Sequence, residues 1–214
     1  MRAVQIDEFG GPEKLHEVDL PTPEPGQAQV LIEVTRAGVN FADTHQRTNS
    51  YLAPAQLPLI PGTEVAGVRT DTGQRVVALT GTGGYAQFVV APEASVFPVP
   101  DDVDDDAAVA ILVAGLTAWH LYTTCAHIGP GESVVVHAGA GGVGSMAIQL
   151  GRHFKAGKVI ATASTEDKRS LTRDLGADAA SDSSPENMTE RLVSSNDGRK
   201  VDAVFEMSGG EVFR

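Results

Sequence analysis

Gly139-Ala140-Gly141-Gly142-Val143-Gly144 is the stretch that decides the fold of this chain of 214 residues. It follows a run that reads as a buried strand and contains the three valines 134–136. It opens a segment, 143–154, whose apolar residues recur at helical spacing. A glycine pattern alone is weak evidence, but a strand before it and a helix after it are the context in which such a loop holds phosphate groups. The alternative is a glycine-rich turn that binds nothing.

Each glycine of this loop has a physical task in the phosphate-binding interpretation. We expect Gly139 to allow the tight turn, Gly141 to let a pyrophosphate approach the backbone, and Gly144 to let the helix pack closely on the strand. The helix that follows offers free N–H groups and the positive end of its dipole to the phosphates. The loop therefore predicts a dinucleotide site.

The sequence on both sides of the loop alternates between strand and helix. After Gly129-Pro130-Gly131, β-branched runs and helical patterns follow one another without the period-two polarity of a half-exposed strand. This alternation predicts a parallel sheet covered by helices. The expected strands are 133–137, 158–163, a weak one near 177–181, and 201–207; the expected helices are 143–154, 166–176 and one around 187–194.

The first hundred residues have a different texture. Short β-like runs at 28–35, 67–70, 75–79 and 85–90 are bounded by proline- and glycine-rich turns, which predicts a compact antiparallel β domain. The cluster 81–84 also contains three glycines, but a strand follows it, so we interpret it as a hairpin and not as a phosphate site.

An acidic run at 100–106 separates the two textures. Its carboxylates stand where a helix over the next apolar run, to about Cys125, would begin, and they favour the positive end of that helix. The alternative is an acidic docking patch. We expect one domain at 1–115 and a second at 116–214.

Composition excludes several classes of protein. The chain has 16 Lys and Arg against 28 Asp and Glu, a net charge of −12, which disfavours nucleic acid and anionic membrane as partners. The single cysteine, Cys125, excludes an internal disulfide, and its place on an apolar helix predicts a core residue. Asp7 comes too early for a signal-peptide core, and the apolar run 107–119 is too short to span a bilayer. We therefore expect a cytoplasmic protein.

The choice of dinucleotide depends on the end of the second expected strand. An acid about 20 residues beyond the glycine motif would bind a ribose hydroxyl and indicate NAD, but Ser164 stands there. Lys168 and Arg169 lie one turn further and can supply positive charge to a 2′-phosphate. This pattern favours NADPH over NADH; the alternative is that both cations are ordinary solvated helix residues.

Several segments together carry a resemblance to a known family over essentially the whole chain. Besides 131–149, which includes the glycine loop, the segments that match in order are Ala37-Gly38-Val39-Asn40-Phe41-Ala42-Asp43, Pro61-Gly62-Thr63-Glu64-Val65-Ala66-Gly67 and Gly115-Leu116-Thr117-Ala118. They resemble the quinone oxidoreductases, the zinc-free, zeta-crystallin-like branch of the medium-chain dehydrogenase/reductase superfamily. The resemblance implies a GroES-like β-barrel followed by a Rossmann domain, with the active site in the cleft between them.

The same resemblance implies functional residues. Those expected near the substrate or the reacting ring are Asn40, Asp43, Tyr51 and Thr117. Those expected to bind NADPH are Asn40, Thr117, Gly139, Gly141, Gly142, Val143, Gly144, Ser164, Lys168 and Ser208. A catalytic zinc is not expected, because Thr63 stands where zinc-dependent relatives have a histidine and 38–43 contains no cysteine.

The implied reaction is hydride transfer from NADPH to a small quinone, with no nucleic acid or membrane partner. Two alternatives stay open: an enoyl or alkenal reductase acting on α,β-unsaturated carbonyls, and a catalytically silent, crystallin-like NADPH-binding protein. Two departures from the family bear on the substrate and the surface. His45 falls where some relatives carry a tyrosine, and the hairpin region 67–76 is shorter than in the family.

The last segment carries an expectation about completeness. A full dinucleotide fold has six parallel strands, and strands five and six have no counterpart after 201–207. We therefore expect a truncated form of a longer reductase whose strand 201–207 is an apolar edge, able to pair with another chain in a homo-oligomer. Such a chain would bind its cofactor weakly.

Overall fold

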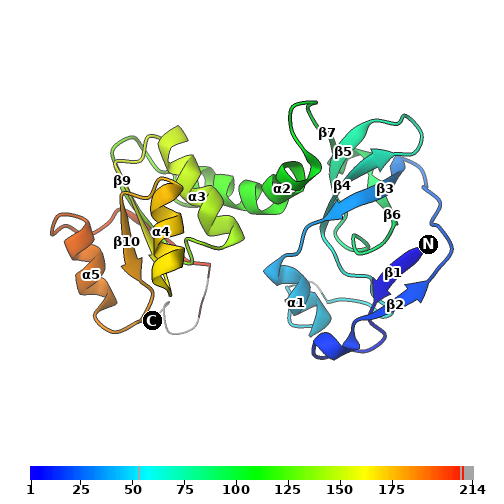
Figure 1. Ribbon diagram of the computed structural model, residues 1–214, viewed down its shortest axis with the longest axis horizontal. Helices are drawn as coiled ribbons and strands as arrows, with labels where there is room; N and C mark the ends of the chain where they lie inside the picture. The colour runs from blue at the N-terminus through cyan, green and yellow to red at the C-terminus, as the bar shows by residue number, and fades with distance from the viewer. Residues whose placement is uncertain (53, 208, 210–214) are drawn as a thin grey trace. The chain divides into compact units, whose positions relative to one another are not determined.

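The computed structural model describes residues 1–52, 54–207 and 209 (Figure 1). The chain forms two compact units, Met1–Val113 and a second that begins at Ala114. The first is built mainly from antiparallel strands and the second from parallel strands with helices. The expectation of a compact antiparallel β domain followed by a parallel sheet with helices is confirmed.

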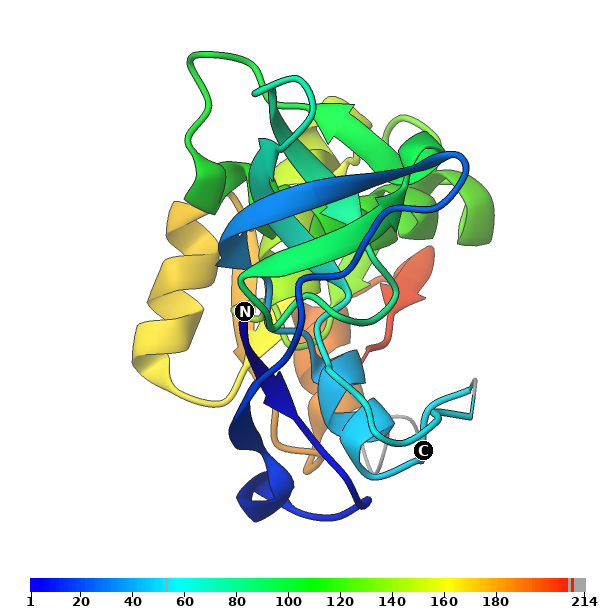
Figure 2. The same ribbon diagram turned by 90° about the vertical axis from the view of Figure 1, so that its right-hand side faces the viewer.

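The first unit is organised around a five-stranded antiparallel sheet in the order β6-β3-β4-β5-β7. Its strands are β3 (Gln29–Ala37), β4 (Glu64–Arg69), β5 (Arg75–Leu79), β6 (Phe88–Pro92) and β7 (Val96–Pro98). A separate antiparallel pair is formed by β1 (Arg2–Gln5) and β2 (His16–Asp19). Figure 2 shows the strong twist of these strands. Branched residues such as Ile32 and Val76 favour the strand conformation and are buried in this sheet.

Side-chain alternation gives this sheet two buried faces. On one face Ile32, Val65 and Val76 share a cluster, and on the other Val77 packs with Leu112 of the helix that follows. The register between β3 and β4 shifts between Val34 and Arg36, as at a β-bulge. The antiparallel β domain expected from the sequence is thus present, with longer strands than expected at β3 and β4.

The segment 81–84 does not form the hairpin that the sequence suggested. Strands β5 and β6, which it connects, are separated in the sheet by β4 and β3. The N–H groups of Gly83, Gly84 and Tyr85 instead donate to the carbonyl groups of Ile60, Gly62 and Pro61. The strand after it begins at Phe88 and not at Tyr85. The backbone N–H of Tyr85 is hydrogen-bonded to the loop that contains Pro61 instead of to a neighbouring strand.

Helix α1 (Phe41–Arg47) was not expected from the sequence. It begins immediately after Asn40, whose backbone N–H donates to the Asp43 carboxylate at 2.8 Å. The proline-rich surroundings favoured turns, but a capping box stabilises this short helix. Two short 3₁₀ helices, Pro12–Lys14 and Glu93–Ser95, complete the unit.

Helix α2 (Asp105–His120) begins where the acidic run predicts a helix start. Asp104 accepts a hydrogen bond of 2.7 Å from the N–H of Ala107, so the capped start is confirmed. The helix continues as a π-helical turn, Leu121–Cys125.

The continuous helix Asp105–Cys125 corrects two expectations. With 21 residues, it is the one helix in the described part of the chain that is long and apolar enough to cross a membrane by length and composition. The apolar run 107–119 is shorter than this helix, because the π-helical turn extends the helix to Cys125. Cys125 is exposed and is not a core residue, because it lies at the end of that turn. Part of the apolar surface is buried, through Ala108, Val109, Leu112, Ala118 and Tyr122.

The second unit contains a parallel sheet in the order β10-β9-β8-β11. Its strands are β8 (Ser133–Val136), β9 (Lys158–Ala163), β10 (Ala179–Asp182) and β11 (Ala203–Phe205), and its helices are α3 (Gly142–His153), α4 (Glu166–Asp174) and α5 (Met188–Ser195). Right-handed crossovers place α3 and α4 on one face of this sheet and α5 on the other. Tyr122, Ile148 and Phe205 are central to the core.

Candidate cofactor and substrate sites

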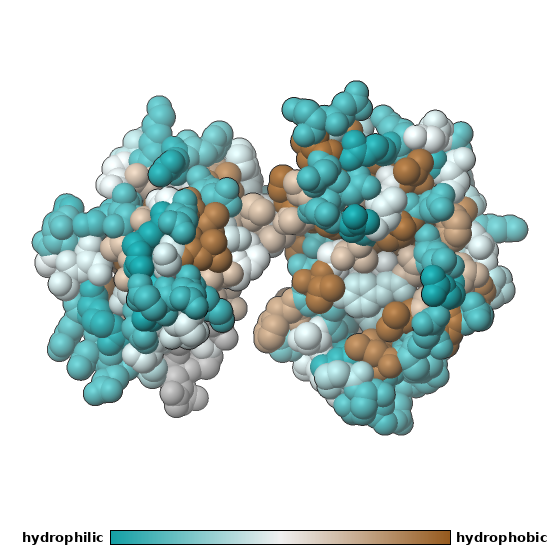
Figure 3. Space-filling model, in the orientation of Figure 1, coloured by the Kyte–Doolittle hydropathy of each residue, from teal (hydrophilic) through white to brown (hydrophobic). Residues whose placement is uncertain are grey.

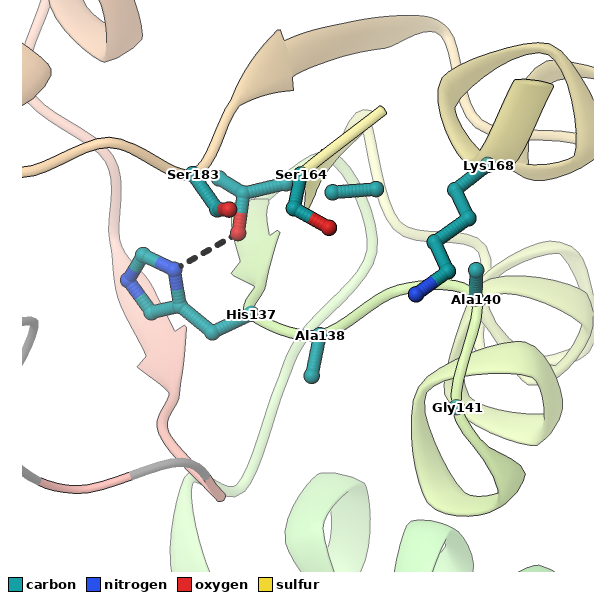
Figure 4. A pocket seen from close by; sticks show the side chains of 9 residues that line it. His137, Ala138, Ala140, Gly141, Ser164, Lys168 and Ser183 are labelled. Carbon is teal, nitrogen blue, oxygen red and sulfur yellow. Dashed lines mark hydrogen bonds between the residues drawn. The ribbon is translucent and has the colours of Figure 1, made fainter. Parts of the chain in front are cut away.

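A cavity of about 360 Å³ opens at the carboxyl ends of the parallel strands in the second unit (Figure 4). His137, Ser164 and Ser183 each come directly after a strand, β8, β9 and β10 respectively, and all three line it. Ala138, Ala140 and Gly141 of the glycine loop form another wall, and Lys168 of α4 faces them. The carboxyl edge of a parallel sheet is where such folds bind their ligands.

The glycines of the loop differ in what a side chain would meet. A Cβ at Gly144 would collide with the backbone of Ala138 and would lie 2.8 Å from Cα of Gly139, so close packing requires a glycine there. A Cβ at Gly139 would lie 2.9 Å from Cβ of Ala161. At Gly141, a Cβ would meet only the carbonyl oxygen of Ala138, at 3.2 Å. Gly139 and Gly144 are thus packed against protein, whereas the backbone at Gly141 is exposed toward the cavity.

The cavity favours an anion. Helix α3 starts at Gly142 after a glycine N-cap with no side-chain cap, so its first N–H groups are available to a ligand. Figure 4 shows Lys168 extending from α4 toward the loop at Ala140. Among the described residues that line the cavity, none is acidic. Gly142 is exposed at the helix start and Val143 is half-buried behind it.

Arg169 does not share the position of its neighbour. Its guanidinium donates to Asp182 at 2.8 Å and to Glu166 at 3.0 Å, and it does not line this cavity. The sequence suggested Lys168 and Arg169 as equal sources of positive charge for a phosphate. Of the two, only Lys168 lines this cavity, together with Ser164.

Sequence reasoning missed His137, Thr162 and Ser183 as lining residues. The Nδ1 atom of His137 lies 2.9 Å from the Thr162 hydroxyl, and both side chains are buried. Burial lowers the pKa of His137, an effect that the nearby Glu206 carboxylate opposes. The signal that could have found these residues is their position at the ends of neighbouring parallel strands, because those ends meet at one edge.

A second polar cluster lies in the first unit, around the start of α1. The Asn40 side chain donates to Glu64 at 2.7 Å and to Thr63 at 3.3 Å. The second oxygen of Glu64 accepts from the N–H of Val113 at 2.6 Å. The Tyr85 hydroxyl donates to Asp43 at 2.7 Å. The described contacts thus join Asn40 to Glu64 and Asp43 to Tyr85.

Burial sets the proton affinities in this cluster. Desolvation raises the pKa of Glu64, which is 3% exposed, while hydrogen bonds from Asn40 and Val113 partly offset that effect. Desolvation, followed by the hydrogen bond to Asp43, raises the pKa of Tyr85 well above its ordinary range. The Tyr85 hydroxyl therefore keeps its proton at neutral pH.

A small cavity of about 150 Å³ lies beside this cluster. Leu15, Val39 and Pro61 supply apolar walls, and Asn40, Asp43, Thr44, Arg47 and Tyr85 complete the lining. The Oδ1 atom of Asp43 has no hydrogen-bond partner among the described residues, although the side chain is only 5% exposed. Figure 3 shows apolar surface where α1 lies. Val39 and Phe41, next to and at the start of this helix, are exposed. The cavity can therefore take an apolar molecule that carries a polar atom.

The remaining expected site residues fall in different places. Tyr51 is 42% exposed and lies outside the small cavity, although Asn40 and Asp43 both line it. Thr117 is an exposed residue of α2 in the second unit. Ser208 lies outside the described residues. In the part of the chain that the structure describes, no group of three or more His, Cys, Asp or Glu residues is arranged to hold a metal ion.

Comparisons with known proteins agree with both halves of this arrangement. Residues 26–101 match the alcohol dehydrogenase GroES-like domain, and residues 142–214 match the zinc-binding dehydrogenase family. A quinone oxidoreductase of Lama guanicoe is 36% identical over 220 residues, which cover 97% of this chain and 66% of the relative. The quinone oxidoreductase of Pseudomonas aeruginosa is 33% identical, with coverage of 99% and 68%. The chain thus spans about two thirds of the length of these relatives.

Solved structures show the same fold. The quinone oxidoreductase of Thermus thermophilus, whose structures include a complex with NADPH, has a TM-score of 0.89 at 37% identity, covering 99% of this chain and 68% of the other. The Escherichia coli quinone oxidoreductase complexed with NADPH has a TM-score of 0.93 at 29% identity, with coverage of 100% and 68%.

Proposed function

The chain belongs to the quinone oxidoreductase branch of the medium-chain dehydrogenase/reductase superfamily, and from this premise we propose that it binds NADPH and reduces a quinone without zinc. The solved relatives bound to NADPH and the relatives named quinone oxidoreductase support the cofactor and the reaction class. We place the protein in the cytoplasm, acting on a small molecule. Pairing of its chains through the edge of the parallel sheet is part of the same proposal.

The observation that carries the proposal is the chemistry of the cavity in the second unit. The open backbone at Gly141 and the start of α3 suit a pyrophosphate. Lys168 and Ser164 offer a cation and a hydroxyl on the same cavity to a ribose phosphate, and the described lining has no carboxylate to repel it. The residues present fit NADPH better than NADH.

When bound, the nicotinamide supplies the hydride, and the protein supplies binding and orientation. The glycine loop and Lys168 hold the charged end of the cofactor in this proposal. Asn40 is fixed through Glu64, because the Asn40 amide donates to that buried carboxylate. The small cavity beside Asn40 takes the apolar acceptor, and Asp43 Oδ1 can accept a hydrogen bond from the hydroxyl that reduction creates.

Tyr85 is poorly suited to supply the proton that completes the reduction. Loss of its proton would place a tyrosinate 2.7 Å from the Asp43 carboxylate and near Glu64 in a desolvated site. We therefore assign Tyr85 to holding Asp43. Water that reaches the small cavity is the proton source in this proposal.

Two other functions fit the same fold. An enoyl or alkenal reductase would use the same cofactor cavity and the same apolar pocket, and it differs only in the acceptor. A catalytically silent NADPH-binding protein would use the second unit alone. The exposed Val39 and Phe41 beside the small cavity favour an enzyme with an apolar substrate over a silent binder.

A two-stage experiment tests the proposal. NADPH is first titrated into the protein by fluorescence, and a benzoquinone or an α,β-unsaturated ketone is then added while NADPH oxidation is followed by absorbance. We expect saturable binding, followed by oxidation that is faster with the quinone. Binding without oxidation of NADPH by either acceptor would support the silent binder, and faster oxidation with the ketone would support the enoyl reductase.

A further inference from the structure

His137 is a buried titratable residue in the wall of the cofactor cavity. It directly follows β8, its side chain is 5% exposed, and its Nδ1 atom lies 2.9 Å from the Thr162 hydroxyl of β9. Its Nε2 atom lies 3.8 Å from a carboxylate oxygen of Glu206, which directly follows β11. Figure 4 shows the imidazole between the strand ends, on the same cavity as Gly141 and Lys168. The ring is therefore part of the site and not only of the core.

The charged groups that face this imidazole are few. Glu206 approaches from the end of β11, and Lys168 lines the same cavity from α4. The neighbours from β8, β9 and the segment after β10 are Ala138, Thr162, Ala163, Ser164 and Ser183, none of which carries a charge. Asp182 directly precedes Ser183 in the chain, but its carboxylate is paired with Arg169.

The two charge states of His137 respond oppositely to a bound anion. Without a ligand, burial favours the neutral ring, since a desolvated imidazolium is costly. A pyrophosphate at the glycine loop brings negative charge into the same partly enclosed cavity, where Coulomb interactions are stronger than in water. The imidazolium then donates from Nδ1 to Thr162, and Nε2–H faces Glu206. Anion binding thus favours the protonated ring.

We propose that His137 is a cofactor-positioning residue that takes up a proton when the pyrophosphate of a dinucleotide binds. The proposal rests on the proposed function, because it requires that the cavity binds a dinucleotide. Its consequence is a pH-dependent affinity for the dinucleotide. The affinity rises as the pH falls into the range in which the imidazole titrates. Above that range the ring stays neutral in both states, and the dependence disappears.

The test uses ADP-ribose, which carries the pyrophosphate but lacks the 2′-phosphate, whose own titration near pH 6 would confuse the result. Binding is measured by isothermal titration calorimetry at several pH values, each in two buffers of different ionisation enthalpy, so that the number of protons taken up is obtained directly. We expect uptake of about half a proton or more near pH 6, and a Kd about twofold or more lower there than near pH 8.

Three variants separate the sources of the proton. His137→Asn, which keeps a polar atom near Thr162, is expected to remove the uptake. His153→Asn changes an exposed histidine of α3 outside the cavity and is expected to leave it unchanged. Glu206→Gln tests whether the neighbouring carboxylate, and not His137, takes up the proton. If Glu206→Gln removes the uptake and His137→Asn does not, the assignment to His137 is wrong.

A measurement on the unchanged protein covers the case in which His137→Asn does not fold. The ring nitrogens of His137 are followed by NMR against pH, with and without ADP-ribose, and the bound form is expected to titrate at the higher pH. Binding of ADP-ribose without proton uptake, or with an unchanged His137 titration, would overturn this inference alone. Absence of binding at every pH would overturn the proposed function as well.

Discussion

Lys168 and Arg169 are neighbours on α4 with different surroundings. Arg169 is held by Asp182 and Glu166, whereas Lys168 lines the cofactor cavity. A paired arginine is already neutralised by its carboxylates and gives up those contacts if it binds a phosphate. Lys168 is thus the one cation among the described residues that line this cavity. We propose that cofactor preference depends on it.

Lys168→Glu tests this dependence. We expect the Kd for NADPH to rise about tenfold or more, because a charge-assisted phosphate contact of roughly 1.5–3 kcal/mol is lost and replaced by repulsion. The Kd for NADH should change much less, and fluorescence titration measures both. Lys200→Glu makes the same charge change at an exposed lysine outside the cavity and should leave both constants as they are. Equal Kd values for the two cofactors in the unchanged protein would contradict the prediction.

Tyr85→Phe tests the polar cluster of the first unit. The variant removes the hydroxyl that donates to Asp43 and leaves that buried carboxylate with its backbone partner at Asn40. We expect the free energy of unfolding to fall by about 1–3 kcal/mol, measured by urea denaturation. Tyr51→Phe is the matched control, because Tyr51 is exposed and outside the cavity. An unchanged stability in Tyr85→Phe would show that the hydrogen bond contributes nothing measurable.

Single residues were the hardest features to predict from the sequence. The glycine loop carries a motif whose spacing is set by backbone geometry, so its place in the chain was evident. His137, Thr162 and Glu206 carry no local motif, since they meet only because three parallel strands end at the same edge. The pairing of Arg169 with Asp182 could not be predicted either, because Asp182 lies 13 residues away in the sequence.

At the scale of elements, the sequence predicted most regular strands and helices near their observed positions, but it did not predict how they are connected. Strands β5 and β9 have the predicted bounds, 75–79 and 158–163, because branched residues and turn signals frame them. The segment 81–84 was misread as a hairpin because the sequence does not show which strands are neighbours in the sheet. Helix α1 was missed because its stability comes from a cap and from tertiary contacts.

Gly144→Ala tests the junction between the glycine loop and α3. A Cβ there would strike the backbone of Ala138 and lie 2.8 Å from Cα of Gly139, so backbone must move. We expect the Tm to fall and the free energy of unfolding to drop by about 1–3 kcal/mol. Gly142→Ala is the control, since its Cβ would meet Cβ of Ala114 at an ordinary 3.7 Å. A Tm equal to that of Gly142→Ala would refute the close-packing argument.

The start of α2 gives a pH-dependent prediction. Hydrogen bonds from Thr35 at 2.6 Å and Arg75 at 2.7 Å lower the pKa of Asp105. A carboxylate with a lowered pKa adds stability at pH values above its unfolded pKa of about 3.9, and this stability is lost as the pH falls through the folded value. Asp105→Asn should therefore cost about 1–2 kcal/mol at neutral pH and progressively less below about pH 4.

Urea unfolding at several pH values measures the effect, with Asp102→Asn as the control for removing one exposed charge from the same acidic run. A destabilisation by Asp105→Asn that stays constant down to the lowest pH would mean that the side chain acts through its shape and not through its charge.

At the scale of the whole molecule, the two units have separate cores and separate sites. The core of the second unit includes Tyr122, Ile148 and Phe205, and the two clusters of the first flank its antiparallel sheet. The change of texture near residue 100 predicted this division, because alternating strands and helices need a different core from a β domain. The two cavities, at Gly141 and at Asn40, likewise lie within single units.

The whole protein is expected to need no metal ion. Glu64 is a buried carboxylate that a cation could balance, but the two donors on its oxygens are the Asn40 amide and the Val113 N–H. Thr63 offers a hydroxyl beside them, and an amide and a hydroxyl are poor zinc ligands compared with thiolate and imidazole. Glu64 is thus stabilised by hydrogen bonds. We expect binding of NADPH, the Tm and any reductase activity to survive exhaustive chelation, with metal analysis finding well below one zinc per chain. Loss of activity on chelation that zinc restores would contradict this prediction and would identify Glu64 as a ligand to test first by Glu64→Gln.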